Sequence, residues 1–205
     1  MDISSRSRSC TVLQVIKLLI CKRKHKSRGN LSIFRLTCSL RRPLLMFSNF
    51  LCYIFPVIVF RKITSLDIDS LIQLMPVYYR HDHLEFDPQK ARQALELFIT
   101  KPDLGQIWLI QDNSGVIGYM IMTYGFSFEC SGREAFIDEL FILAEHRGKG
   151  AGSKAIQHAE NHAKKMGIKM IRLEVTKTNP EAMKLYLRSG FQDWDRTLLA
   201  MPLKP

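Results

Sequence analysis

The stretch Arg147-Gly148-Lys149-Gly150-Ala151-Gly152 lies between a hydrophobic strand-like run and an amphipathic helical run, and it decides the fold. Glycines at alternate positions let the backbone turn tightly and bring successive N–H groups close to an anion. The N-terminus of the helix that follows adds unsatisfied donors and the positive end of the helix dipole. The stretch therefore predicts a phosphate or pyrophosphate site rather than a plain structural turn.

Two common phosphate-binding motifs fit this stretch to different degrees. A P-loop ends in Gly-Lys-[Ser/Thr], whereas residues 152–154 read Gly-Ser-Lys, so this motif fails. Residues 150, 152 and 155 match the Rossmann pattern G-x-G-x-x-[GA], and Glu174 ends the next strand-like run. A dinucleotide-binding fold stays open as an alternative, although the upstream runs look like an antiparallel hairpin rather than a βαβ series.

Hydrophobic periodicity on either side of this stretch predicts alternating strands and helices. Upstream we expect a strand at 57–60, a helix at 68–75 ended by Pro76, a helix opened by Asp87-Pro88, a hairpin of strands at 107–110 and 116–124, and a strand at 135–143. Downstream we expect a helix at 151–166, a strand at 169–175, a helix at 179–189 and a closing strand at 198–203. The order β-α-α-β-β-β-α-β-α-β indicates one α/β domain with a mixed central sheet flanked by helices.

The net charge of +11 belongs to the N-terminal segment. Residues 1–62 hold 13 Lys or Arg and one acid, whereas residues 63–205 hold 17 Lys or Arg and 18 Asp or Glu. The basic charge is therefore no argument for a nucleic-acid partner, and none is expected. We expect residues 1–57 to form an extension outside the fold and residues 58–205 to form the domain.

The composition of the extension leaves its role open. It is rich in Ser, Arg and Lys, as organelle transit peptides are, so an organellar location is the alternative to a cytoplasmic one. The apolar run at 44–60 is at the lower limit for a membrane span and is broken by Ser48, Asn49 and Pro56, so a membrane anchor is not favoured.

Three motifs together resemble the GNAT superfamily, the acetyl-CoA-dependent N-acetyltransferases. Arg147-x-x-Gly150-x-Gly152 matches the family signature [QR]-x-x-G-x-[GA], and the strand-like run 136–142 resembles the family's fourth strand. The stretch Asn179-Pro180-Glu181-Ala182, followed by Leu185-Tyr186 and Ser189-Gly190-Phe191, resembles its last helix. The similarity covers about residues 58–205 and includes the order of elements, while the residues before it have no counterpart.

This resemblance implies acetyl-CoA as co-substrate, with no metal. The backbone of the glycine stretch would hold the CoA pyrophosphate, the strand before it would pair with the pantetheine arm, and Asn179 would contact CoA, although a role as helix cap for Pro180 explains it equally well. The implied cofactor-binding residues are Leu140, Phe141, Ile142, Arg147, Gly148, Lys149, Gly150, Ala151, Gly152 and Asn179.

The resemblance also implies catalytic residues. Tyr186 would protonate the departing CoA thiolate, since a tyrosine with an ordinary pKa is protonated at neutral pH. A base is needed because an alkylamine is mostly ammonium at pH 7. Asp138 and Glu139 are adjacent on a strand and are expected to point to opposite faces, with Asp138 favoured as base and Glu139 in reserve.

These observations predict an N-acetyltransferase that transfers acetyl directly to a primary amine in a ternary complex. The acids Glu129, Glu134 and Asp138 favour a small cationic acceptor, and a homodimer is left open. Alternatives are a catalytically silent acyl-CoA-binding module and a dinucleotide-binding oxidoreductase. His158 and His162 are expected on a solvated helix face, because their spacing lacks the glutamate placement of a zinc protease.

Overall fold

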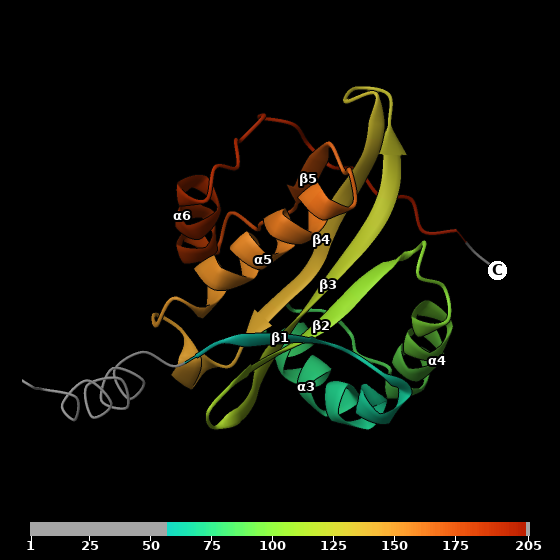
Figure 1. Ribbon diagram of the computed structural model, residues 1–205, viewed down its shortest axis with the longest axis vertical. Coiled ribbons are helices and arrows are strands. Elements are labelled where there is room, and N and C mark those ends of the chain that lie inside the picture. Colours follow the sequence, from blue (N-terminus) through green and yellow to red (C-terminus); the bar gives the residue numbers. More distant parts are fainter. Residues whose placement is uncertain (1–56, 204–205) are drawn as a thin grey trace, which may run out of the picture. The chain divides into compact units, whose positions relative to one another are not determined.

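The computed structural model describes residues 57–203, which form a central sheet with helices on both faces (Figure 1). The elements follow the predicted order up to its last member. Their bounds are β1 Val59–Lys62, the 3-10 helix η1 Ser65–Asp67, α3 Ile68–His81, α4 Pro88–Ile99, β2 Gly105–Asp112, β3 Gly115–Ser127, β4 Gly132–Ile142, the 3-10 helix η2 Ala144–His146, α5 Ala151–Lys165, β5 Met170–Leu173 and α6 Pro180–Arg188.

The sheet has five strands in the order β1-β2-β3-β4-β5. The first three pairings are antiparallel and the last, between β4 and β5, is parallel, with α5 as the crossover that a parallel pair requires. This mixed sheet confirms the predicted α/β class. It also excludes the doubly wound parallel sheet of the dinucleotide-binding alternative.

Two hydrophobic clusters, one on each face of the sheet, hold the layers together. On one face α5 packs small side chains, including Ala155 and Ala159, against Trp108 of β2. On the other face α3 and α4 pack Leu71 and Leu95 against the sheet. Burying one large apolar side chain stabilises a fold by roughly 1.5–3 kcal/mol, so the two clusters fix both helix layers.

Helix α3 continues through Pro76, where the sequence predicts its end. A proline inside a helix removes one hydrogen bond and costs about 3 kcal/mol. Beyond Pro76, however, Tyr78 and Tyr79 pack against the cluster that α3 shares with α4, and this packing offsets the lost bond. The predicted stop is therefore wrong, and the last turn of α3 brings two tyrosines against the sheet.

The predicted closing strand at 198–203 is also wrong. These residues lie in neither a helix nor a strand, and Leu198, Leu199, Met201 and Leu203 are 68–87% exposed. A strand needs a neighbour to pair with, and Pro202 has no N–H to donate to one. Within the described residues the sheet ends at β5.

The predictions for the N-terminal extension concern residues outside the described part of the chain, so the domain boundary near residue 58 stays a prediction. Between residues 57 and 203, no helix combines the length and the apolar character that crossing a membrane requires.

Candidate functional site

The glycine stretch forms the loop that leads into α5. Gly148 and Gly150 have φ angles of 72° and 86°, in the left-handed region that side chains other than glycine rarely adopt. Gly150 is the N-cap of α5 and supplies no side chain to the first backbone N–H groups, and the first turn carries no acidic residue. The start of α5 therefore offers its donors and its dipole to an anion from outside.

The two basic side chains of the loop are held against the protein. Arg147 Nε donates to the carbonyl oxygen of Ile142 at 2.8 Å, and its guanidinium lies 5.7 Å from the centre of the Phe141 ring. Lys149 Nζ donates to the carbonyl oxygen of Glu145 at 2.8 Å. The first bond holds the loop to the end of β4 and the second holds it to η2, so both cations are kept within the loop that leads into α5.

Strand β4 presents an open edge next to this loop. It pairs with β5 only from Glu134, opposite Met170, to Ile137, opposite Leu173. Beyond Ile137 the described residues give this edge no strand partner, although β4 continues to Ile142. An unpaired edge can accept an extended ligand through main-chain hydrogen bonds. Leu140, Phe141 and Ile142 belong to this part of β4, directly before the loop.

A bulge interrupts β4 at Asp138. The partners of Ile121 and Met122 on β4 are Glu139 and Ile137, so Asp138 is an extra residue in the pairing. Ile137 and Leu140 consequently pack into the same cluster, on the α5 face, although they are three residues apart. The bulge thus removes the regular alternation from which Asp138 and Glu139 were expected to point to opposite faces.

Glu139 is a buried carboxylate held by two tyrosines. It is 8% exposed, and its two oxygens accept hydrogen bonds from Tyr79 Oη at 3.0 Å and from Tyr119 Oη at 2.6 Å. Burial raises the pKa of Glu139; the two hydrogen bonds oppose this rise, and the charges of Asp138 and Asp82 add to it. Since both oxygens already accept hydrogen bonds, the Glu139 carboxylate is better suited to holding a negative charge in place than to accepting and passing on a proton.

Asp138 differs from its neighbour because it is exposed. The surrounding protein still removes enough water to raise the pKa of its carboxyl group. Its charge also raises the pKa values of Tyr78, Tyr79 and Glu139. In the described part of the chain no hydrogen bond or ion pair engages this carboxylate. A partly dehydrated, accessible carboxylate of raised pKa is a suitable general base.

A third acid, Asp82, joins these two at the end of α3. Its charge raises the pKa values of Tyr78, Glu139 and Tyr186, although burial makes the largest contribution to each. Asp82 therefore lies near both β4 and α6. From sequence, His81-Asp82-His83 is a polar connector that could border the substrate site, but Asp82 is not among the predicted site residues because the predicted stop at Pro76 takes it out of the helix. A tyrosine pair followed by an acid at helical spacing was the available signal.

Glu129 and Glu134, in contrast, are already neutralised. Arg172 contacts Glu129 at 2.7 Å and Glu134 at 2.9 Å, and Arg196 contacts Glu129 at 2.8 Å. The hydrogen bonds from Arg172 and then Arg196 lower the pKa of Glu129. These two acids pair with protein cations, so they give no argument for a cationic acceptor, contrary to the expectation from sequence.

Tyr186 lies on α6, half-buried against the α5 cluster, with its ring edge-on to Phe191 at 5.8 Å between centres. Burial raises the pKa of Tyr186, and the charge of Asp82 adds to the rise. Its hydroxyl is therefore protonated well above neutral pH. This state suits a proton donor, and packing alone also explains the ring.

Asn179 is the N-cap of α6. Its Oδ1 accepts the backbone N–H of Ala182 at 3.1 Å, and Pro180 occupies the first turn. The amide oxygen is thus occupied by capping, which leaves only the Nδ2 group for any contact with CoA.

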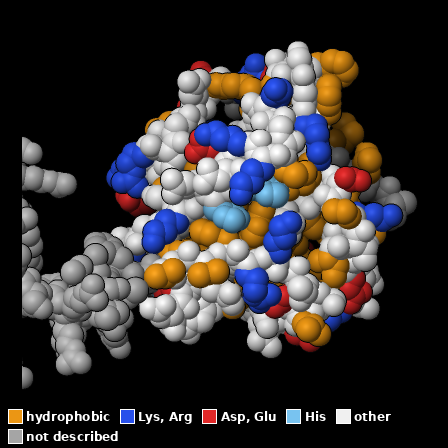
Figure 2. Space-filling view, in the orientation of Figure 1, with side chains coloured by type: hydrophobic (Ala, Val, Ile, Leu, Met, Phe, Trp, Pro, Cys, Tyr) orange, Lys and Arg blue, Asp and Glu red, His pale blue; other side chains and the backbone are white. Residues whose placement is uncertain are grey.

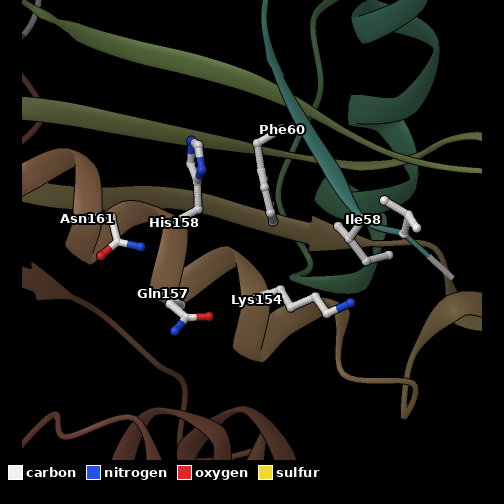
Figure 3. Close-up of a pocket in the computed structure, with 7 residues that line it drawn as sticks. Ile58, Phe60, Lys154, Gln157, His158 and Asn161 are labelled. Atoms are coloured by element: carbon white, nitrogen blue, oxygen red, sulfur yellow. The ribbon is translucent and has the colours of Figure 1, made fainter. Parts of the chain in front are cut away.

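A separate hollow of about 460 Å³ lies between β1 and α5 (Figure 3). It is lined by Val57, Ile58, Phe60, Lys154, Gln157, His158 and Asn161, none of which is a predicted site residue. Figure 2 shows histidine side chains on this face with Lys and Arg around them. The lining contains no carboxylate, so this hollow is not where the three acids gather.

The two histidines of α5 are half-buried and pack against aromatic side chains of the sheet. His158 stacks on Phe60 at 4.4 Å between ring centres, and His162 Nε2 lies 2.6 Å from Tyr124 Oη. Burial lowers the pKa values of both, which favours the neutral form of each ring. The expectation of a solvated face is wrong, since it took histidine as polar and overlooked the stacking. Between residues 57 and 203, no three His, Cys, Asp or Glu side chains gather as metal ligands.

Known proteins match the part of the chain that holds these residues. The model of the Acetyltransferase (GNAT) family matches residues 68–191. An uncharacterized N-acetyltransferase of Methanocaldococcus jannaschii is 27% identical over 135 residues, which cover 65% of this chain and 60% of that protein. A thialysine N-epsilon-acetyltransferase of Bos taurus is 35% identical over 78 residues, covering 38% and 45%. The chain thus spans less than two thirds of either relative.

Solved structures share the fold over most of their length. An integron cassette protein from a salt-marsh metagenome is 32% identical, with a TM-score of 0.64, covering 71% of this chain and 91% of that one. A predicted acetyltransferase of Clostridium acetobutylicum, solved with acetyl-CoA, has a TM-score of 0.60 at 20% identity, covering 71% and 96%.

Proposed function

Because the chain belongs to the GNAT acetyltransferase family, we propose that it transfers the acetyl group of acetyl-CoA directly to a primary amine of a small cationic acceptor. Family membership makes the protein an acyltransferase. The acceptor and the site residues are the proposal. The observation that carries it is the group of three carboxylates, Asp82, Asp138 and Glu139, without a basic partner.

After burial, the charges of Asp82 and Asp138 both raise the pKa values of Tyr78 and Glu139, so both acids lie within electrostatic range of Glu139. Each ion pair described among residues 57–203 joins its Lys, Arg or His to some other acid. Uncompensated charges in a partly dehydrated site favour a cation from outside. An ammonium group of the acceptor supplies that charge, which supports a cationic amine as substrate.

The chain has residues that fit acetyl-CoA. The uncapped start of α5 and the open edge of β4 suit a pyrophosphate and an extended arm, respectively. The residues that would hold it are those of the loop from Arg147 to Gly152 and of the strand from Leu140 to Ile142. When bound, acetyl-CoA supplies an acetyl group activated as a thioester.

Two residues would move protons. The carboxylate of Asp138 accepts the proton that the acceptor's ammonium must lose before its nitrogen can form the new bond to carbon. With acetyl-CoA bound, the Oη of Tyr186 would donate a proton to the CoA sulfur as the carbon–sulfur bond breaks, and the second proton lost by the amine nitrogen would restore the Tyr186 hydroxyl through solvent. Glu139, fixed by Tyr79 and Tyr119, keeps a negative charge beside the ammonium.

An acceptor screen tests the proposal. Release of the CoA thiol would be followed with a panel of diamines, monoamines, aminoalkylphosphonates and lysine-containing peptides. We expect diamines to have the highest kcat/KM, because a second ammonium meets the remaining carboxylates. Preference for the phosphonates, or binding of acetyl-CoA without turnover of any amine, would contradict it.

Variants then locate the acceptor. Asp82→Asn should raise KM for the best diamine by roughly tenfold and change monoamines little, since one close ion pair is worth about 1–2 kcal/mol. Glu85→Gln is the matched control, because Glu85 is an exposed acid in the same connector. Equal effects of the two variants would remove Asp82 from the acceptor site.

The pH profile tests Asp138. Only its ionised form can accept a proton, so kcat/KM should fall as the pH drops through the raised pKa of its carboxyl group. Asp138→Asn should lower the rate most at low pH. The rate should recover partly as the pH approaches the pKa of the acceptor's amine. An unchanged acid limb would assign the base to another group.

A further inference from the structure

The hollow between β1 and α5 has one apolar wall and one polar wall. Ile58 and Phe60 alternate along the chain at β1 and pack against the cluster that α5 shares with the sheet. The opposite wall comes from one side of α5, where residues at helical spacing supply Lys154, Gln157, His158 and Asn161 (Figure 3). The volume of about 460 Å³ is typical of small-molecule sites, which measure about 300–1,000 Å³. A ligand with an apolar body and polar groups along one side therefore fits both walls.

Two further lysines lie beside this hollow. Lys165 ends α5, one helical turn beyond the polar wall, and Lys62 follows Phe60 in the alternation of β1. Burial is the largest cause that lowers the pKa values of the two histidines of α5. The charge of Lys165 also lowers the pKa values of His158 and His162, and the charge of Lys62 lowers that of His162. Both lysines therefore lie within electrostatic range of these rings.

No carboxylate balances this positive charge within the described residues. No acid among them contributes to the pKa shifts of the two histidines. The ion pairs described between residues 57 and 203 include neither Lys62 nor Lys165, whereas the neighbouring Lys164 pairs with Glu160. His158 also has a buried Nε2 atom without a hydrogen-bond partner in this part of the chain. A cleft with charges of one sign concentrates ions of the opposite sign, so the hollow favours an anion.

The hollow is separate from the proposed acetyl-CoA site. The sheet order places β1 at one edge, with β2 and β3 between it and β4. None of the residues that line the hollow belongs to the glycine loop or to the open edge of β4. The two sites share only helix α5, so their ligands need not compete. The segment that precedes β1 is rich in Lys and Arg, so like charge disfavours it as the occupant.

We propose that the hollow between β1 and α5 binds a small organic anion, in which an acid group is joined to an apolar body, and that it does so independently of acetyl-CoA. The apolar body packs against Ile58 and Phe60 of β1. The acid group lies toward Lys62 and Lys165, where its charge compensates theirs. The exposed amide of Gln157 supplies a hydrogen-bond donor from the polar wall.

Fluorescence titration of the full chain, with CoA in excess, tests the need for an acid group. The probe 1-anilinonaphthalene-8-sulfonate carries an acid group on an aromatic body, and N-phenyl-1-naphthylamine is the same body without it. We expect the sulfonate to bind with one site per chain and the uncharged probe to bind at least tenfold more weakly. Equal binding of the two probes, or displacement of the sulfonate by CoA, would overturn the proposal.

Two pairs of variants locate the bound sulfonate. Gln157→Glu places a carboxylate of the same shape in the exposed lining and should raise the Kd at least fivefold; Gln93→Glu, on an exposed position of α4, is its control. Lys165→Gln should raise the Kd about threefold, and Lys164→Gln, which makes the same change in net charge beside it, should raise it less. Circular dichroism would verify that all four variants are folded. A Kd that neither Gln157→Glu nor Lys165→Gln changes would overturn the proposal.

The ring signals of the histidines in NMR spectra give an independent measurement. Binding of the sulfonate should shift the signals of His158 and His162, whereas His146, which contacts Asp112 at 3.0 Å, should keep its signal. Unchanged signals of His158 and His162 at saturation would place the probe elsewhere and overturn the proposal. Phenyl phosphate and phenylacetate should displace the probe, and the tighter competitor identifies the acid group. Equal displacement by 2-phenylethanol would show that no anion is required, which also overturns it.

Discussion

Helices α5 and α6 begin in opposite ways. At α6 the protein caps its own helix, since Asn179 accepts a backbone N–H and Pro180 removes another donor from the first turn. At α5 the N-cap is Gly150, which has no side chain to offer. Helix α4 resembles α6, with Asp87 accepting from two backbone N–H groups at 2.9 and 3.1 Å.

The difference separates two ways in which a helix can serve a site. A helix N-terminus that is capped by a side chain is stable by itself, whereas an uncapped N-terminus depends on an external anion. The proposed role of α5 therefore rests on backbone and on the absence of side chains, and that of α6 on one side chain, Tyr186. Substitutions at the two helices test this division.

The largest effect is expected on α6. Tyr186→Phe removes one hydroxyl and keeps the ring, so turnover should fall by roughly 10²–10⁴, the range for a general acid, with little change in CoA affinity. Tyr124→Phe, which removes a hydroxyl that contacts His162, is the control. Steady-state kinetics with the best amine and CoA titration would measure both quantities. Full turnover in Tyr186→Phe, with chemistry limiting the rate, would reduce Tyr186 to a packing residue.

At α5 the effect should fall on binding. Gly150→Val forces a β-branched residue into a φ of 86° where the backbone must meet phosphate, so the Kd for CoA should rise at least tenfold, or about 1.4 kcal/mol. Gly115→Val is a matched control, because Gly115 also has a positive φ and open space around it. Both should lose stability in thermal melts, but only the first should lose affinity in calorimetry. Equal CoA binding by both would contradict the pyrophosphate site.

The cap of α6 gives a smaller effect. Asn179→Ala should lower the free energy of unfolding by about 1 kcal/mol, the usual value of an N-cap, in a urea titration. Asn179→Asp keeps a capping oxygen but loses Nδ2, so it should retain stability and weaken CoA binding about threefold. Unchanged binding in Asn179→Asp would confine Asn179 to its capping role.

The smallest effect is expected at the start of α4 when the pH is lowered. The backbone hydrogen bond from Lys90 is the main cause that lowers the pKa of Asp87. A carboxyl group whose pKa is lower in the folded state stabilises above its unfolded pKa, and this contribution is lost as the pH falls through the folded value. Amide exchange at Gln89 and Lys90 should therefore quicken below about pH 4 relative to Asp87→Asn. Equal pH dependence in both would show that Asp87 does not hold the start of α4.

Local signals were readable from the sequence. The Asp87-Pro88 start, the glycine loop and the hairpin each depend on neighbouring residues, and all were found where predicted. The stop at Pro76 failed because packing of Tyr78 and Tyr79 in the core outweighs a local break. The same error left Asp82 out of the predicted site, because its position depends on the last turn of α3.

Other features depend on contacts between distant segments. The bulge at Asp138 appears only in the pairing of β3 with β4, and the histidines of α5 find ring partners on the sheet. The tail at 198–203 reads as a strand but has no neighbour to pair with in the described chain. No short stretch of the sequence contains both partners of any of these contacts.

The bulge at Asp138 has an evolutionary consequence. In a regular strand, deleting one residue turns every following side chain to the opposite face, which a folded protein rarely survives. Here the deletion of Asp138 would restore ordinary alternation, with Ile137 and Leu140 still on the α5 face and Glu139 still between them. The number of carboxylates near the acceptor could thus change through a single-codon deletion, so related genes could diverge in charge preference while retaining the fold.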